Sequence, residues 1–318
     1  MKLFQQITWA IFLAGLLVAT GPVGFAADVP PAPSSAFPLT ITDGAHRVVR
    51  LAAPPHRIIS LSPAATDILV NIGAHAELVG VTRYCTVPAA DESHVKRLGG
   101  VLDPDYEGLV ALKPDLVVMP LLADKSMQDK LTALGLTFVI LHPEGLAGVL
   151  ADIRMVARAT GHEETGETTA NYIEAIRALV MSRWKDVPEE KRPRVLILMD
   201  GASPAPGSYV DDLLTAAGGR NVVPKGTKAW VTVSTESILQ LNPDLIINIF
   251  QSPATTPMSS PPQNTFGKFT LKTVLNGQEF FRPGPDLGAG LWELARTIYP
   301  DKFPETTISR PVSTPAAK

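Results

Sequence analysis

The sequence predicts an α/β protein of two lobes, each built on a parallel sheet, with one long α-helix joining them and a ligand cleft between them. Three observations carry this prediction. Short β-branched runs alternate with amphipathic stretches along the chain. A segment of the first half recurs in the second half, and one helical stretch is unusually long. The length of 318 residues suits one large domain or two medium ones.

The strands and the first helix of the first half follow from short local signals. Residues 57–61 form a β-branched run typical of a strand. Ser62 is placed to cap a helix that has Pro63 at its first position and ends at Gly73. Further strands are expected at residues 78–81, 116–119 and 137–141.

Two helices in succession link the halves. The first is expected from about residue 146 to 160 and is closed by Gly161. The second runs from residue 163 to about 185, because Tyr172, Ile176 and Val180 recur at helical spacing. The strand pattern resumes at residues 194–199.

The repeat is the strongest internal observation. The segment EGLVALKPDLVV, from Glu107, reappears as ESILQLNPDLII, from Glu236. Both read as a helix, a proline stop and a buried strand. The strand, small-residue loop and short helix near the start of each half also correspond. Two similar halves predict two lobes with the concave place for a ligand between them; the alternative is a chance recurrence of Pro-Asp-Leu.

The first 26 residues resemble a secretory signal peptide, with Lys2, an apolar run and the small residues Gly24 and Ala26 near the expected cleavage site. An uncleaved anchor is the alternative. The only cysteine is Cys85, so lipid attachment at a new N-terminal cysteine is not expected. The expected organisation is signal peptide 1–26, flexible lead-in 27–37, first lobe 38–162, bridging helix 163–186, second lobe 187–303 and flexible tail 304–318, with a surface loop at 253–262.

Composition excludes several classes of protein. With 31 acidic and 28 basic residues, the chain lacks the clustered positive charge of nucleic-acid binding. One cysteine excludes an internal disulfide or a cysteine-based zinc cluster. The sequence has no nucleophile elbow, phosphate-binding loop or HExxH pair, and its six histidines are scattered. We therefore expect no catalytic residue, metal site or resident cofactor, and a monomer.

Ligand-binding candidates in the first half follow the predicted strands, where a parallel sheet presents its crevice. Ser62, Pro63 and Ala64 open a helix whose amides could hold an anionic group; the alternative for Ser62 is a plain N-cap. Arg83 and Tyr84 supply a cation, an aromatic face and a hydroxyl; the alternative for Tyr84 is a place in the core.

The second half offers matching candidates. Ser208 and Tyr209 stand at the equivalent turn from strand to helix, where Tyr209 could instead only pack its helix. Trp230 is a large aromatic residue in a loop rich in Lys and Gly, six residues before Glu236.

Several stretches together resemble the Fe/B12 periplasmic-binding family. They are PHRIISLSPAAT from Pro55, VGVTRYC from Val79, GGVLDPDYE from Gly99, LKPDL from Leu112 and RPGP from Arg282. Members of this family are substrate-binding proteins of ABC importers for cobalamin, ferric siderophores and haem. The resemblance covers about residues 38 to 300 and implies two α/β lobes bridged by one rigid helix.

The resemblance also implies roles for single residues. Glu107 and Glu236 match the glutamates that pair with permease arginines in cobalamin-binding members, and both are also acids suited to a first helical turn. Tyr84 and Trp230 match aromatic positions of the cobalamin cleft. The family's other cleft tryptophan is missing, because Val101 and Leu102 stand near its place. A ferric chelate is therefore at least as well suited as a corrinoid.

The sequence thus predicts an exported, periplasmic receptor that captures a ferric siderophore or a corrinoid and delivers it to an ABC permease with its ATPase subunit. One alternative is a haem or metal receptor that uses Tyr84, Cys85 or a histidine as a direct ligand. The other is a two-lobed enzyme, for which the loops after the strands offer only Asp124 and Asp200 as carboxylates in different lobes.

Overall fold

The computed structural model describes residues 37–121, 125–199, 201–226, 228–249, 270–274, 277, 282–304 and 308. The expected signal peptide, nearly all of the lead-in, the loop at 253–262 and most of the tail lie outside the described residues. Asp124 and Asp200, the carboxylates of the enzyme alternative, also lie outside them.

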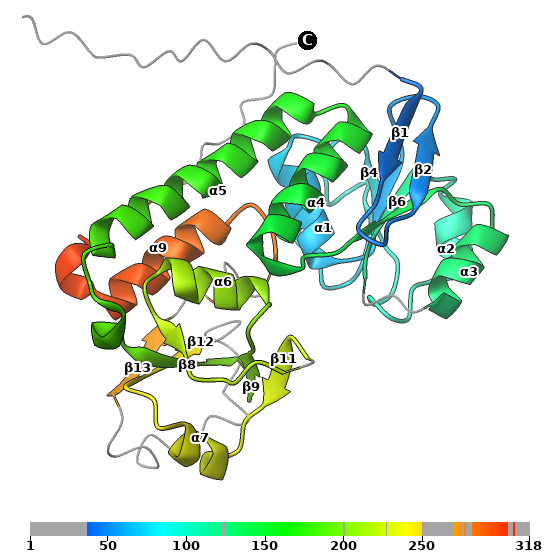
Figure 1. The fold of residues 1–318 in the computed structure, drawn as a ribbon. Coiled ribbons are helices and arrows are strands. Elements are labelled where there is room, and N and C mark those ends of the chain that lie inside the picture. The colour runs from blue at the N-terminus through cyan, green and yellow to red at the C-terminus, as the bar shows by residue number, and fades with distance from the viewer. Residues whose placement is uncertain are drawn as a thin grey trace, which may run out of the picture. The chain divides into compact units, whose positions relative to one another are not determined.

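The first half forms a five-stranded, wholly parallel sheet in the order β5-β4-β3-β6-β7 (Figure 1). Its elements are β3 (Ile58–Ser60), α1 (Pro63–Asn71), β4 (Leu78–Val81), β5 (Lys96–Arg97), α2 (Tyr106–Ala111), β6 (Leu116–Pro120), α3 (Lys125–Ala133) and β7 (Phe138–Leu141). The predicted strands at 57–61, 78–81, 116–119 and 137–141 are therefore confirmed. A hairpin of β1 (Leu39–Thr42) and β2 (Val48–Leu51), which the sequence did not reveal, precedes this sheet.

The second sheet has the order β11-β9-β8-β12-β13, with β10 also paired to β8. Its elements are β8 (Arg194–Met199), β9 (Ala202–Pro204), α6 (Tyr209–Ala216), β10 (Arg220–Asn221), β11 (Trp230–Thr232), α7 (Thr235–Leu241), β12 (Leu245–Ile249) and β13 (Thr270–Val274). Strands β8, β10, β12 and β13 are parallel. Strands β9 and β11 are antiparallel additions where loops were expected, and that expectation was wrong.

The internal repeat is visible in the hydrogen bonds of the two sheets. Asp115 accepts hydrogen bonds from the backbone N–H groups of His56 and Arg57, and the Arg57 side chain donates to the Leu112 carbonyl. In the second half, Asp244 accepts from the Arg194 N–H. The Arg194 side chain likewise donates to the Leu241 carbonyl. The same side chains thus fasten the first strand of each sheet to the end of the helix in the repeated segment.

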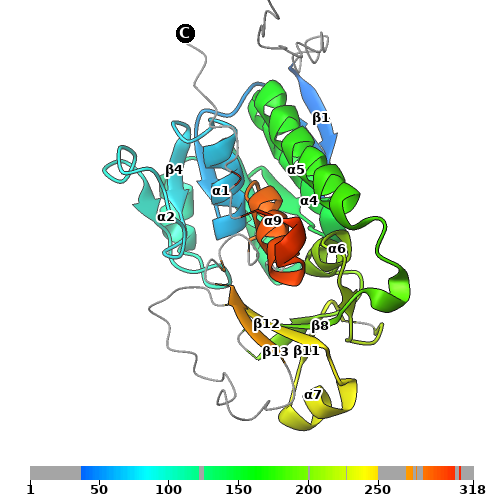
Figure 2. The same cartoon turned by 90° about the vertical axis from the view of Figure 1, so that its left-hand side faces the viewer.

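Helices α4 (Gly145–Thr160) and α5 (Glu163–Trp184) connect β7 to β8. Gly161 ends α4 in the left-handed conformation, with φ of 77°, as expected for a C-terminal glycine. Figure 2 shows α5 beside α4, with α9 (Leu287–Ile298) near both α5 and α6. Gly166 on α5 lies so close to Ala157 on α4 that any side chain there would clash.

One hydrophobic core joins the two halves. It contains buried residues of β3 and α1, of the connecting helices α4 and α5, and of β8, α6 and α9. Two smaller clusters lie on the other faces of the sheets. The predicted fold class, two mainly parallel α/β sheets joined through a long helix, is confirmed. No helix within the described part of the chain combines the length and hydropathy needed to cross a membrane.

A buried carboxyl group makes stability depend on pH. Asp152 on α4 is 5% exposed, and its carboxylate accepts a hydrogen bond from the His142 backbone N–H. Burial, aided by the nearby Asp43 carboxylate, raises the pKa of Asp152 to about 7, although the hydrogen bond opposes the shift. Because the folded pKa exceeds the unfolded value, the free energy of unfolding should fall as pH rises from about 4 to about 7.

The variant Asp152→Asn should remove this dependence, because an amide can still accept the His142 hydrogen bond without ionising. A pKa raised from about 4 to about 7 corresponds to about 4 kcal/mol, and an unpaired amide N–H costs about 1–3 kcal/mol. We expect a net gain of about 1–3 kcal/mol at pH 8, measured by urea denaturation at pH 4.5 and 8. The exposed control Asp129→Asn should keep the wild-type dependence; an unchanged slope in Asp152→Asn would contradict the assignment.

Candidate functional site

The first group of predicted site residues lies where β3 ends. Ser62 is buried and caps α1, accepting a hydrogen bond from the Ala65 backbone N–H at 3.1 Å, with Pro63 in the first turn. Pro63 and Ala64 are half-buried. The N-cap role of Ser62 is therefore confirmed, and its side-chain oxygen is already engaged. Any contact of this turn with a ligand would come from its backbone and from Pro63 and Ala64.

The second group follows β4, the strand next to β3. The Arg83 guanidinium lies over the Tyr84 ring, 5.0 Å from its centroid, and contacts the Asp103 carboxylate at 3.3 Å. Hydrogen bonding to Tyr84, followed by the charge of Asp103, raises the pKa of Arg83 above its ordinary value. Tyr84 is 56% exposed, so its alternative as a core residue was wrong. The pair offers solvent a cation and an aromatic face.

The third group belongs to the second sheet. Ser208 is buried, accepts from the Asp211 N–H and donates to the Ala205 carbonyl, so it caps α6 as Ser62 caps α1. Tyr209 is buried, and burial raises the pKa of its phenol above the usual range, which keeps it neutral. The Tyr209 and Trp230 rings meet edge to face, with centroids 6.5 Å apart.

Trp230 occupies a strand and not the loop that the sequence predicted. It is the first residue of β11 and pairs with Pro204 of β9. Its side chain is half-buried against the main core. Both backbone pairing and the Tyr209 ring therefore fix the indole, which leaves part of its surface free for contact.

The structure thus brings the candidates together in two sets. Ser62, Pro63 and Ala64 follow β3, and Arg83 and Tyr84 follow the adjacent parallel strand β4, so these five share one carboxyl edge. Ser208, Tyr209 and Trp230 form the other set, around the start of α6. Carboxyl edges of parallel sheets are where α/β proteins bind ligands.

Contacts between the two halves, which the sequence did not reveal, involve α6 of the second set and α1, which begins in the first set. Glu144 pairs with Ser208 in an isolated antiparallel bridge. The Leu146 N–H at the start of α4 donates to the Asp212 carboxylate on α6 at 2.8 Å. Arg282, before α9, forms an ion pair with Asp67 on α1 at 3.1 Å. No sequence window could show these contacts, because their partners are distant in the chain.

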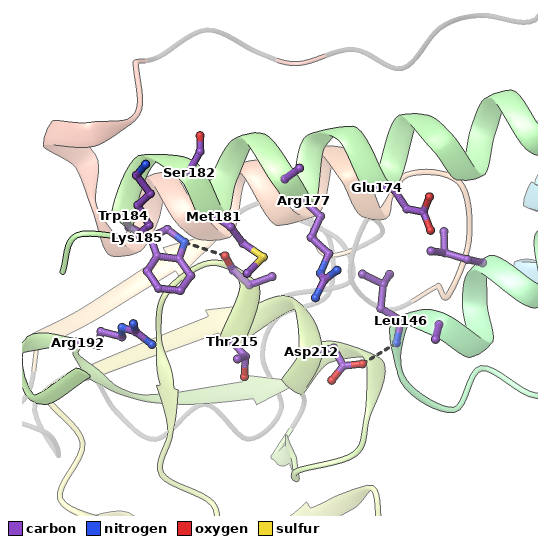
Figure 3. A pocket seen from close by; sticks show the side chains of 14 residues that line it. Leu146, Glu174, Arg177, Met181, Ser182, Trp184, Lys185, Arg192, Asp212 and Thr215 are labelled. Carbon is purple, nitrogen blue, oxygen red and sulfur yellow. Dashed lines mark hydrogen bonds between the residues drawn. The ribbon is translucent and has the colours of Figure 1, made fainter. Parts of the chain in front are cut away.

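A pocket of about 770 Å³ lies elsewhere, between α4, α5 and α6 (Figure 3). Figure 3 shows Arg177 and Met181 extending from α5 toward α6, and Trp184 donating through its indole N–H to the Ala216 carbonyl. None of the predicted site residues lines this pocket. Its lining therefore differs from the candidate ligand site, although it includes Leu146 and Asp212, which lie near the second set.

Glu107 and Glu236 take equivalent places in the two halves. Each is exposed and stands second in its helix, after the N-caps Asp105 and Ser234. Hydrogen bonds from its own backbone N–H and from Ser234 lower the pKa of Glu236, which keeps the carboxylate charged. Each glutamate is thus an acid in a first helical turn that points charge into solvent.

The sequence left open a receptor that binds a metal directly through protein side chains. Across the described ranges, no three His, Cys, Asp or Glu side chains gather as a metal site would require. Cys85 is buried, with its sulfur 3.1 Å from the Thr82 hydroxyl oxygen. Of the direct ligands considered for a metal, Cys85 is thus buried, whereas Tyr84 and the histidines His46, His56 and His94 are exposed.

Comparisons with known proteins agree with this architecture. A family model described as periplasmic binding protein matches residues 58–258. A cobalamin-binding protein of Halobacterium salinarum is 28% identical over 251 residues, covering 74% of this chain and 67% of that protein. The ABC transporter substrate-binding lipoprotein YvrC of Bacillus subtilis is 26% identical, over 85% of this chain and 88% of its own. The molybdate-binding protein of Haemophilus influenzae has a similar fold, with a TM-score of 0.71, 22% identity, and coverage of 83% and 92%.

Proposed function

The chain belongs to the periplasmic binding protein family, and on this premise we propose that it is the substrate-binding protein of an ABC importer. It captures a corrinoid or a ferric siderophore and delivers it, chemically unchanged, to the membrane permease. The observation that carries the proposal is the placement of an exposed cation and aromatic face on one sheet and a fixed indole on the other, within a twofold internal repeat.

The proposed ligand site lies between a first lobe of residues 38–162 and a second lobe of residues 187–303. Arg83 and Tyr84 would contact the ligand from the first lobe, and Trp230, held by Tyr209, would contact it from the second. Large ligands with planar or chelated centres suit such a site, because aromatic faces bury apolar surface while few polar groups fix orientation. The N-terminal turns of α1 and α6 would add backbone N–H groups.

Two ligand chemistries remain in competition with the corrinoid. The similarity to a cobalamin-binding protein favours a corrinoid. The first candidate beside it is a ferric siderophore, because Val101 and Leu102 stand near the place of the second cleft tryptophan of cobalamin-binding members. Haem is the second candidate, favoured by the exposed Tyr84 phenol, which could bind iron directly. A charge-transfer absorption band from phenolate to ferric iron on adding haemin, lost in Tyr84→Phe, would distinguish direct ligation from simple stacking.

We place the protein in the periplasm, after removal of the segment 1–26, with the permease and its ATPase as partners. The family that matches the chain is described as periplasmic binding protein, and we propose no reaction on the ligand. Glu107 and Glu236 are proposed as the permease contacts. Their exposure and their equivalent positions in the repeat suit a partner with two equivalent basic sites.

Thermal denaturation with a ligand panel tests this function. The mature chain should be heated with cyanocobalamin, dicyanocobinamide, haemin and several ferric siderophores. A ligand at about 100 times its Kd adds about 2.7 kcal/mol to the free energy of unfolding, and so raises the melting temperature of the true complex. Failure of the entire panel to shift the transition would overturn the ligand class.

Because one hydrophobic cluster spans both halves, we expect ligand binding to close the lobes only slightly. Helix α5 is packed against α4 and α9, and Trp184 ties it to α6. Small-angle scattering curves with and without the stabilising ligand should therefore nearly superimpose. A large fall in radius of gyration on binding would show that the two sheets move as hinged bodies.

A further inference from the structure

Both helices that carry the proposed docking glutamates also expose an aliphatic side chain at the same place. Val110 on α2 is 42% exposed and Leu239 on α7 is 46% exposed. Each stands three residues after its glutamate, Glu107 or Glu236. Residues three apart on a helix are neighbours on one face. Each lobe therefore presents a carboxylate directly beside an exposed aliphatic group.

Exposure of one aliphatic residue carries no meaning, because single exposed apolar side chains are common on protein surfaces. The recurrence is more informative. From Tyr106 and Thr235 to Lys113 and Asn242, aligned positions have the same degree of burial in both halves. The residue before each exposed aliphatic group, Leu109 or Ile238, fills the core with at most 1% exposure. Val110 and Leu239 are therefore exposed aliphatic residues at equivalent positions, in addition to the neighbouring residues that fill the core.

We propose that Val110 and Leu239 are the apolar anchors of permease docking, each entering a recess beside the basic side chain that pairs with Glu107 or Glu236. This proposal rests on the proposed function. It commits to one partner: a membrane permease with two equivalent sites, each a cation flanked by apolar surface. The two exposed carboxylates and the internal repeat support it, since two equivalent acidic surfaces are best met by two equivalent basic sites.

The aliphatic anchors and the glutamates would make different contributions to docking. Charge pairs at an interface rim mainly set the encounter rate and are screened by salt. Aliphatic side chains gain free energy by leaving water, which screening does not weaken. Docking should therefore keep a component that resists salt, and this component should depend on Val110 and Leu239.

The test measures docking without any ligand. The permease–ATPase complex that the chain serves is held in lipid nanodiscs on a biosensor, and the chain is titrated at low salt and at about 1 M salt, where the Debye length is about 3 Å. Val110→Ser/Leu239→Ser should weaken docking by about 100-fold, about tenfold for each site, at both salt concentrations. Val110→Leu should dock at least as tightly as wild type.

A matched control comes from the same chain. Leu134 and Leu179 are 39% and 40% exposed and lie outside the repeated helices. Leu134→Ser/Leu179→Ser should dock like wild type. Equal docking of Val110→Ser/Leu239→Ser and wild type would overturn the anchors while leaving the proposed function intact. A wild-type chain that does not dock at all would overturn both, and thermal denaturation with the ligand panel would then show whether ligand binding survives.

Discussion

Reversing Glu107 and Glu236, the proposed docking residues, in the variant Glu107→Lys/Glu236→Lys, should abolish ligand-stimulated ATP hydrolysis by the reconstituted importer. Both carboxylates are exposed, and both stand second in equivalent helices. Two lysines would repel the basic sites proposed on the permease, and like charges facing each other cost several kcal/mol. A single reversal should give an intermediate loss, larger at low salt, where screening lengths are longer.

The ligand affinity of the double variant separates docking from binding. Neither glutamate belongs to the groups around Tyr84 or Trp230, so the Kd for the ligand should stay at the wild-type value. Glu163→Lys/Glu164→Lys, at the start of α5, supplies a control with the same change of net charge. Normal stimulation by the docking variant, or a loss of ligand binding, would refute the docking assignment.

Truncating Trp230 should cost the most ligand affinity of any single change. The indole is held by β11 pairing and by the edge of Tyr209, so little conformational entropy is lost when a ligand covers it. Buried aromatic anchors are typical hot spots, and Trp230→Ala should weaken binding by about 2–4 kcal/mol, or about 30- to 1000-fold. Titration with the ligand that stabilises the wild-type chain measures the loss.

Two companion variants make the result interpretable. Trp230→Phe keeps an aromatic face and should recover part of the affinity, whereas Leu179→Ala on α5 should have no effect. Circular dichroism must show that Trp230→Ala remains folded, since the indole also packs against the core. A folded Trp230→Ala chain with wild-type affinity would reduce Trp230 to a packing residue.

The sequence predicted those elements whose signals are local. The Ser62 cap, Pro63 in the first turn and the Gly161 stop define helix ends by their own backbone preferences, and the structure has the helix ends there. The repeat predicted two sheets, because the same order of helix, proline and strand needs the same neighbours twice. The repeat also put Glu107 and Glu236 in equivalent positions, as the structure has them, whereas their docking role came from the family resemblance and stays a prediction.

The sequence misled where pairing with distant residues decides the structure. Pro204, with glycines and prolines around it, indicates a loop, yet β9 forms because it pairs with β11, more than twenty residues later. Strand formation depends more on such neighbours than on intrinsic preference. The contact of Asp212 with the start of α4 was hidden for the same reason. Exposure of Val110 and Leu239 could not be predicted either, because both read as ordinary core positions of amphipathic helices.

Titration calorimetry of the mature chain with cyanocobalamin, haemin and ferric siderophores tests the central claim, that this protein binds its ligand without altering it. We predict that at least one of these ligands binds at one site per chain, with a micromolar or tighter Kd. The ligand should then be recovered chemically intact after the protein is unfolded. Continuous heat release from turnover, a modified ligand, or the absence of binding throughout the series would contradict it.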